Sequence, residues 1–230
     1  MENKDINEIV NLFKSGKFDS AEKKIAKLIN KSPNNYILYN LLGSISLGQN
    51  NLEKAIINYK KCIKTNPNYA SGYNNLAVSL ASLKKYEQAI NIYQQAIKIK
   101  PDYVEAFTNL GFALDKFGKL KESMHSYKQA IEINPNYVDA HKNLGKLFRK
   151  IGKIEEARTC FNKVIGLEPK NIEYKINGEL LIAPIPQSVK EINFYRDQYE
   201  IGLKTLEQYK YLTQYPGSTI KINSFYLSYH

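Results

Sequence analysis

The sequence is poor in features that would mark a secreted, disulfide-bonded or membrane-embedded protein. It contains two cysteines, Cys62 and Cys160, which are too few for a disulfide framework and lie far apart in the chain. Each falls on the inner side of a predicted helix, so we expect packed, inert thiols. No apolar run reaches the length of a membrane span, and residues 1–5 lack the basic-then-apolar pattern of a signal peptide. We therefore expect a cytoplasmic protein.

The residue types that carry out catalysis are present without a catalytic pattern. His125 and His141 fall in different predicted helices and His230 is the last residue, so the histidines lack metal-ligand spacing. No glycine-rich phosphate loop follows a predicted strand, and the Ser, Cys and acidic residues form no triad or carboxylate pair. We expect no cofactor, no metal and no catalytic residue, and so a chain that is not a complete enzyme.

The formal net charge of +11 is unevenly distributed. Residues 172–230 contain equal numbers of basic and acidic residues, so the whole excess lies in residues 1–171. A basic excess points to nucleic acid, an acidic protein or a membrane surface as partner. The sequence is also rich in Lys, Asn, Ile and Tyr, which an AT-rich genome produces without functional selection. Both explanations of the charge stay open.

Prolines recur at a constant interval of 34 residues, at Pro33, Pro67, Pro101, Pro135 and Pro169. Alignment on these prolines divides the chain into five units: 2–35, 36–69, 70–103, 104–137 and 138–171. Matched positions in the first predicted helix of each unit carry a leucine followed by a small residue: Leu42-Gly43, Leu76-Ala77, Leu110-Gly111 and Leu144-Gly145. Matched positions in the second carry a small residue and, four residues later, a large one: Ala21 and Ile25, Ala55 and Tyr59, Ala89 and Tyr93, Ser123 and Tyr127, Ala157 and Phe161. This spacing predicts paired helices in close contact.

The repeated pattern resembles the tetratricopeptide repeat (TPR), and the resemblance covers about three quarters of the chain. Gly16, Gly118 and Gly152 lie at the expected turn between the two helices, where a left-handed backbone favours glycine. The resemblance implies an all-α, right-handed superhelix whose first helices line a concave groove for a protein or an extended peptide. In unit 1, Asp5 and Glu8 replace the aromatic residue and the leucine, so we expect its first helix to act as an N-terminal cap.

Asparagine occupies one groove position in three successive units, at Asn75, Asn109 and Asn143. A side-chain amide is both donor and acceptor, so it can pair with the N–H and C=O of an extended peptide whatever the peptide sequence. Asparagines one repeat apart would then form a ladder along the peptide, related to strand addition. Duplication of a repeat also produces such a column.

The other predicted groove residues are Thr108, Phe112, Lys116, Lys142, Lys146, Arg149 and Lys150. The basic members indicate either an acidic stretch of partner or a solvated helix face, and both interpretations stay open. The clamp with which chaperone-binding TPR proteins hold a C-terminal carboxylate is not supported. Units 2 and 3 have no basic residue on that face, which presents Asn40, Leu41, Asn74 and Val78.

Residues 172–230 lack the repeat and predict a small mixed α/β extension. A linker ends at Pro184 and Pro186, a capping box at Ser188 opens a helix of about 189–210, and residues 219–229 alternate as a strand does. This tail is similar to the junction after the TPR arm of bacterial proteins related to the SPINDLY and O-linked N-acetylglucosamine transferase family. The resemblance implies an arm that recruits polypeptide substrate to a glycosyltransferase, with catalytic lobes beyond His230. It also matches Asn75, Asn109 and Asn143 to that family's asparagine ladder.

Three functions therefore follow from the sequence. The first is a protein- or peptide-binding TPR module, which the tail narrows to the substrate-recruiting arm of a glycosyltransferase. The second is a stand-alone scaffold or assembly adaptor. The third is a basic solenoid that binds RNA, which is less favoured because the basic residues are not interleaved with exposed aromatic residues. We expect no membrane partner, and self-association stays open.

Overall fold

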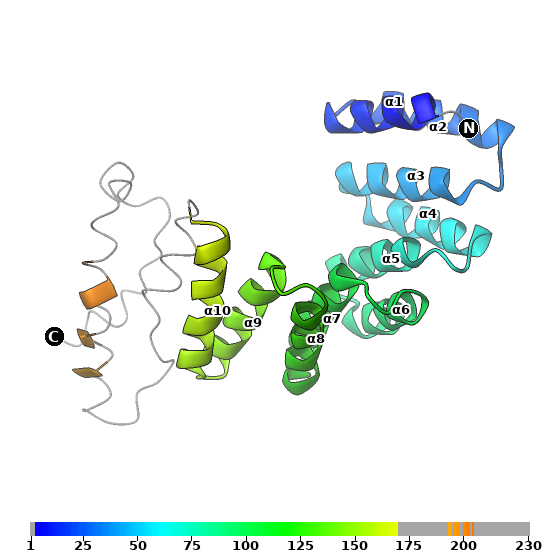
Figure 1. Cartoon of the computed structure of the whole chain (residues 1–230). Helices are drawn as coiled ribbons and strands as arrows, with labels where there is room; N and C mark the ends of the chain where they lie inside the picture. The colour runs from blue at the N-terminus through cyan, green and yellow to red at the C-terminus, as the bar shows by residue number, and fades with distance from the viewer. Residues whose placement is uncertain (1–2, 170–192, 195, 198–199, 203, 205–230) are drawn as a thin grey trace. The chain divides into compact units, whose positions relative to one another are not determined.

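The computed structural model of the chain describes residues 3–169, 193–194, 196–197, 200–202 and 204 (Figure 1). Residues 3–169 are helical, with short turns between the helices, and each unit of the sequence alignment contains one pair of successive helices. The helices of this part are α1 (Asn3–Lys14), α2 (Phe18–Lys31), α3 (Tyr36–Gly48), α4 (Leu52–Thr65), α5 (Ala70–Ser82), α6 (Tyr86–Ile99), α7 (Val104–Phe117), α8 (Leu120–Ile133), α9 (Val138–Lys150) and α10 (Ile154–Leu167).

The chain groups into two compact units, residues 1–135 and residues 136–230. In the first, each odd-numbered helix packs on the even-numbered helix that follows, from α1–α2 to α7–α8. The pairs stack in chain order, because α2 contacts α3, α4 contacts α5 and α6 contacts α7. In the second unit α9 packs on α10. This repeated helix-turn-helix packing is that of a TPR solenoid.

The small and large residues of the second helices form the core. The small residues have no exposed surface in any pair: Ala21, Ala55, Ala89, Ser123 and Ala157. The large residues four positions on are at most 2% exposed: Ile25, Tyr59, Tyr93, Tyr127 and Phe161. Serine is tolerated at the small-residue position of α8 because the Ser123 hydroxyl donates a 2.7 Å hydrogen bond to the Gly111 carbonyl oxygen.

Glycine on the facing first helix allows the buried tyrosine to approach the backbone. A Cβ atom on Gly43 would lie 2.4 Å from the Tyr59 ring, and one on Gly111 would lie 2.6 Å from the Tyr127 ring. Both distances are well below van der Waals contact. The spacing between glycine and tyrosine is thus a packing requirement of the α3–α4 and α7–α8 pairs.

The two cysteines are free and buried. Burial raises the pKa of the Cys62 thiol to about 11, so this thiol is protonated at neutral pH. Because the thiolate is the reactive form, Cys62 is chemically inert in the folded chain.

A left-handed residue closes the first helix of every pair. These residues are Gly16 (φ +71°), Asn50 (φ +58°), Lys84 (φ +60°), Gly118 (φ +92°) and Gly152 (φ +78°). They follow one another at the repeat interval of 34 residues. Glycine adopts this conformation freely and asparagine tolerates it, whereas the Cβ atom of a lysine is crowded there. The third turn is therefore the most strained of the five.

We expect Lys84→Gly to raise the free energy of unfolding by about 0.5–1 kcal/mol. Relief of the left-handed strain, roughly 1–2 kcal/mol, outweighs the greater entropy that glycine loses on folding. The reverse change at the matched turn, Gly118→Lys, should lower the free energy of unfolding by about 1 kcal/mol. Urea denaturation followed by far-UV circular dichroism measures both, and a Lys84→Gly variant no more stable than the parent would contradict this account.

The described residues between 193 and 204 have helical backbone, within the helix that the sequence predicts at 189–210. The predicted linker and the predicted strand at 219–229 lie outside the described residues. Within the described part of the chain, no helix is both long enough and apolar enough to cross a bilayer.

Candidate peptide-binding surface

The first helices α3, α5 and α7 lie side by side, since α3 contacts α5 and α5 contacts α7. Their faces away from the second helices form the surface on which the sequence places the groove. We call this surface of α3, α5 and α7 the first-helix face. It carries two of the three asparagines of the predicted column, Asn75 and Asn109, together with Phe112 and Lys116.

Four asparagine side chains on the first-helix face form a continuous hydrogen-bonded chain. The Asn109 Nδ2 donates to Asn74 Oδ1 at 3.1 Å, and the Asn75 Nδ2 donates to Asn40 Oδ1 at 3.0 Å. Within α5, the Asn74 Nδ2 donates to Asn75 Oδ1 at 3.4 Å. Each bond between repeats therefore joins a column asparagine to the residue that precedes the column position in the previous repeat. We call these four residues the amide chain.

The amide chain leaves part of each column amide unused. A side-chain amide has two N–H donors and an oxygen with two lone pairs. In the described contacts Asn75 uses one donor and one lone pair, and Asn109 uses one donor. Both side chains are half-buried. Each can therefore hold its neighbour in the solenoid and still offer a donor and an acceptor to a bound segment.

An exposed aromatic residue, Phe112, follows Asn109 by three residues on α7. Phe112 is 42% exposed, although the matched residues of the two preceding repeats are the smaller Ser44 and Val78. The Lys116 Nζ lies 5.4 Å from the centroid of the Phe112 ring, within cation–π range. An exposed phenylalanine covered by a cation offers an apolar contact and a positive charge at one place.

Thr108 precedes the column position in α7, and the structure places it differently from its predicted neighbours. It is 4% exposed, and its hydroxyl donates a 2.9 Å hydrogen bond to the Val104 carbonyl oxygen of its own helix. Serine and threonine side chains within helices commonly bond the preceding turn in this way. The bond to Val104 occupies the Thr108 hydroxyl without any ligand, and a binding role for Thr108 stays a prediction.

The remaining predicted residues lie on α9, in the second compact unit. Asn143 and Arg149 are half-buried there, and Lys146 and Lys150 are exposed. Lys142 forms an ion pair with Asp139 one turn earlier on the same helix. These α9 residues therefore belong to the unit of residues 136–230, and Asn75 and Asn109 belong to the unit of residues 1–135.

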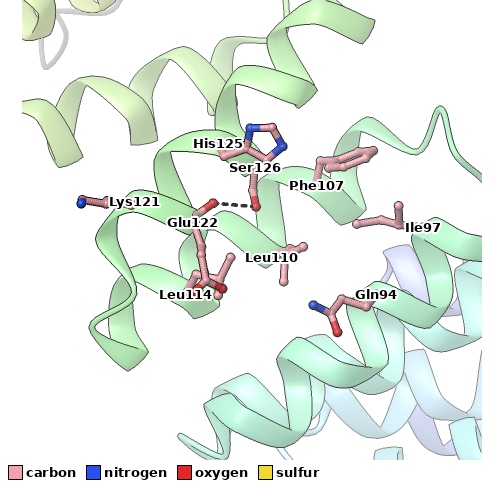
Figure 2. A pocket seen from close by; sticks show the side chains of 9 residues that line it. All are labelled: Gln94, Ile97, Phe107, Leu110, Leu114, Lys121, Glu122, His125 and Ser126. Carbon is pink, nitrogen blue, oxygen red and sulfur yellow. Dashed lines mark hydrogen bonds between the residues drawn. The ribbon is translucent and has the colours of Figure 1, made fainter.

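A hollow that the sequence analysis does not predict is lined by residues of α6, α7 and α8 (Figure 2). Its volume is about 460 Å³, and its lining is mostly apolar: Gln94, Ile97, Phe107, Leu110, Leu114, Lys121, Glu122, His125 and Ser126. The Ser126 hydroxyl donates a 3.0 Å hydrogen bond to the Glu122 carbonyl oxygen. Ser126 matches the bulkier Ile92 of the preceding repeat in the alignment. This change to a smaller side chain is the sequence signal that could have indicated the hollow.

Family models for the tetratricopeptide repeat match successive parts of the chain. Models described as "TPR repeat" match residues 79–118 and 116–152, and models described as "Tetratricopeptide repeat" match residues 36–69, 58–91 and 138–171. Together they cover residues 36–171, which is more than half of the chain. No curated protein matches the chain in a sequence comparison.

Solved structures with the same fold include proteins from several systems. PilW, a type IV pilus biogenesis factor, has a TM-score of 0.77 at 16% identity, with 94% of each chain covered. PilF of Pseudomonas aeruginosa has a TM-score of 0.74 at 18% identity and covers 94% of this chain and 92% of its own. YrrB, a TPR protein with an unusual peptide-binding site, has a TM-score of 0.58 at 20% identity and covers 80% and 97%. These similarities show a shared fold, and with the family matches they establish that the chain belongs to the tetratricopeptide repeat family.

Proposed function

We propose that this chain is a protein-interaction module that binds an extended segment of polypeptide on the first-helix face. The observation that carries this proposal is the amide chain, whose column asparagines keep a free donor and acceptor at successive repeats. An extended peptide needs a regular series of such groups for its own N–H and C=O groups. The peptide-binding site of the structurally similar YrrB supports this use of the fold.

Phe112 and Lys116 give the proposed site a preference among peptides. Exposed aromatic residues in the middle of a binding surface commonly contribute most of the affinity. The ring would hold an apolar side chain, and the Lys116 ammonium would favour a carboxylate beside it. We therefore propose that the partner is an acidic segment that contains apolar side chains.

Binding is tested with peptides selected from a random displayed library on the whole chain. We expect Asn75→Ala combined with Asn109→Ala to weaken binding of the selected peptides about tenfold, because each lost hydrogen bond contributes about 0.5–1.5 kcal/mol. Isothermal titration calorimetry measures the affinity, and far-UV circular dichroism checks that helicity is retained.

The matched control replaces two exposed asparagines of second helices, Asn91→Ala and Asn162→Ala. This variant changes the same number of amides away from the first-helix face, so it should bind with parental affinity. If the column variant also binds every selected peptide with parental affinity, the first-helix face is not the binding site and the proposal fails.

The narrower hypothesis of a glycosyltransferase arm rests on the tail, which lies almost wholly outside the described residues. The family matches end at residue 171 and give it no support. A nucleotide-binding domain encoded in frame after His230 would favour it. A scaffold that joins other proteins through the same surface is the broader form of our proposal. Cytoplasmic location stays a prediction, and self-association stays open.

A further inference from the structure

We propose that Asn40 and Asn74 are positioning residues of the peptide-binding surface, which fix the amides of Asn75 and Asn109 in one orientation. This inference rests on the proposed function and deepens it. Asn40 and Asn74 are matched positions of successive repeats, one residue before the column in α3 and α5. In both cases the side-chain oxygen accepts a hydrogen bond from the asparagine 35 residues further along the chain.

The two bonds have the same direction. In each, the later repeat donates through Nδ2 and the earlier repeat accepts through Oδ1, at 3.0 Å for Asn40 and 3.1 Å for Asn74. Asn74 also donates to Asn75, so it connects the two bonds. Hydrogen bonds aligned in this way polarise one another and are stronger than isolated ones. Since Asn74 is only 7% exposed, water cannot readily replace its partners.

A held amide is a better ligand for a peptide backbone than a free one. The terminal torsion of an asparagine side chain is broad and roughly two-fold, so an unrestrained amide exchanges its N–H and C=O directions. In Asn75 and Asn109 one N–H is fixed towards the previous repeat, which also fixes the direction of the second N–H and of the oxygen. The peptide then does not have to order these side chains, and a saving of this kind improves affinity by roughly three- to tenfold for each side chain.

Asn40 and Asn74 use different hydrogen-bonding groups of their side chains. In the described contacts the Asn40 side chain serves as an acceptor, and aspartate supplies the same acceptor. Asn74 accepts from Asn109 and donates to Asn75, and aspartate supplies only the first of these functions. Leucine, of similar size, supplies neither. Aspartate and leucine variants at the two positions therefore separate hydrogen bonding from packing.

The test measures Asn40→Leu, Asn40→Asp, Asn74→Leu and Asn74→Asp against one selected peptide without charged side chains. We expect Asn40→Leu to weaken binding three- to tenfold, and Asn40→Asp to restore parental affinity. Asn74→Leu should weaken binding more than Asn40→Leu, because it removes the bond that holds Asn109 and also one of the two bonds that hold Asn75. Asn74→Asp should lie between Asn74→Leu and the parent.

A second readout needs no peptide. In ¹⁵N correlation spectra of the free chain, Asn40→Leu should move the side-chain amide signals of Asn75 and speed their hydrogen exchange, while those of Asn109 change little. Asn74→Leu should affect both pairs of signals. A purely structural role would instead lower the melting temperature without changing affinity measured well below it.

The failure of this inference is distinguishable from the failure of the proposed function. If the column variant loses affinity but Asn40→Leu and Asn74→Leu bind as the parent does, the first-helix face binds peptide and the positioning role is overturned. If Asn40→Asp is as weak as Asn40→Leu, acceptor chemistry is not the cause and the inference is also overturned. If the column variant itself keeps parental affinity, the proposed function fails first.

Discussion

Replacement of Tyr127 by alanine should lower the free energy of unfolding by about 3–5 kcal/mol, the usual cost of removing a large buried aromatic side chain. The ring is 2% exposed and fills the space beside Gly111. Because glycine has no side chain to move into the vacated volume, the cavity can close only by movement of the two helices. The cost should therefore lie in the upper part of this range.

The chain itself supplies the control for this substitution. Phe161 is buried at the matched position of the last repeat, so the side chain introduced by Tyr127→Phe is one that this position already accommodates. It should cost about 1 kcal/mol or less, the contribution of one hydrogen bond. Urea denaturation by far-UV circular dichroism compares the two variants, and a Tyr127→Ala cost near that of Tyr127→Phe would show that the ring is not a main element of the core.

Strong alkali should unfold the chain by ionising the buried tyrosines of the second helices, Tyr59, Tyr93 and Tyr127. Burial raises the pKa of Tyr59 to about 12, and it raises the pKa of Tyr93 and Tyr127 further. The unfolded chain has phenols of ordinary pKa, about 10. Folding therefore favours the neutral phenol, and the corresponding stability is complete below pH 10 and is lost as the pH rises above it. For Tyr59 alone the loss is about 2–3 kcal/mol near pH 12.

The expected observation is a fall in the urea midpoint between pH 10 and pH 12, together with the absorbance change of phenolate formation. A variant with Tyr59→Phe, Tyr93→Phe and Tyr127→Phe should keep its helicity to higher pH, although it has the same lysines. If the triple variant unfolds at the same pH as the parent, deprotonation of other groups causes the transition, and burial of the phenols does not control it.

The helices of residues 3–169 were predictable because one repeat interval places every small residue, large residue and turn. The left-handed turns were predictable only in part, because two of the five left-handed residues are not glycine. Glycine identifies the conformation at Gly16, Gly118 and Gly152, and asparagine is a weaker signal at Asn50, whereas Lys84 adopts it without a local signal. Only the matched position in the alignment indicates the turn at Lys84, since the packing of the helix pair imposes the turn on whatever residue is there.

The asparagine column was visible in the sequence, but the partners of its side chains were not. A column at an interval of 34 residues suggests identical neighbours, whereas the bonds join residues 35 apart, at two different positions of successive repeats. Side-chain direction on packed helices decides this pairing, and sequence spacing alone does not contain it. The same limit applies to Thr108, which is a surface position by spacing and is buried in the structure.

The amide chain also determines which repeat, if duplicated within the chain, would extend the hydrogen-bonded series. Unit 3 (70–103) carries both the accepting and the donating asparagine, Asn74 and Asn75. A duplicate of this unit inserted after Tyr103 would donate to the original Asn74 and accept from Asn109, so the hydrogen-bonded series would lengthen by one step without a mismatch. A copy of unit 2 or unit 4 would leave the series at its present length, because Leu41 and Thr108 occupy one of the two positions in those units. Growth of the solenoid by gene duplication is thus compatible with this surface through unit 3.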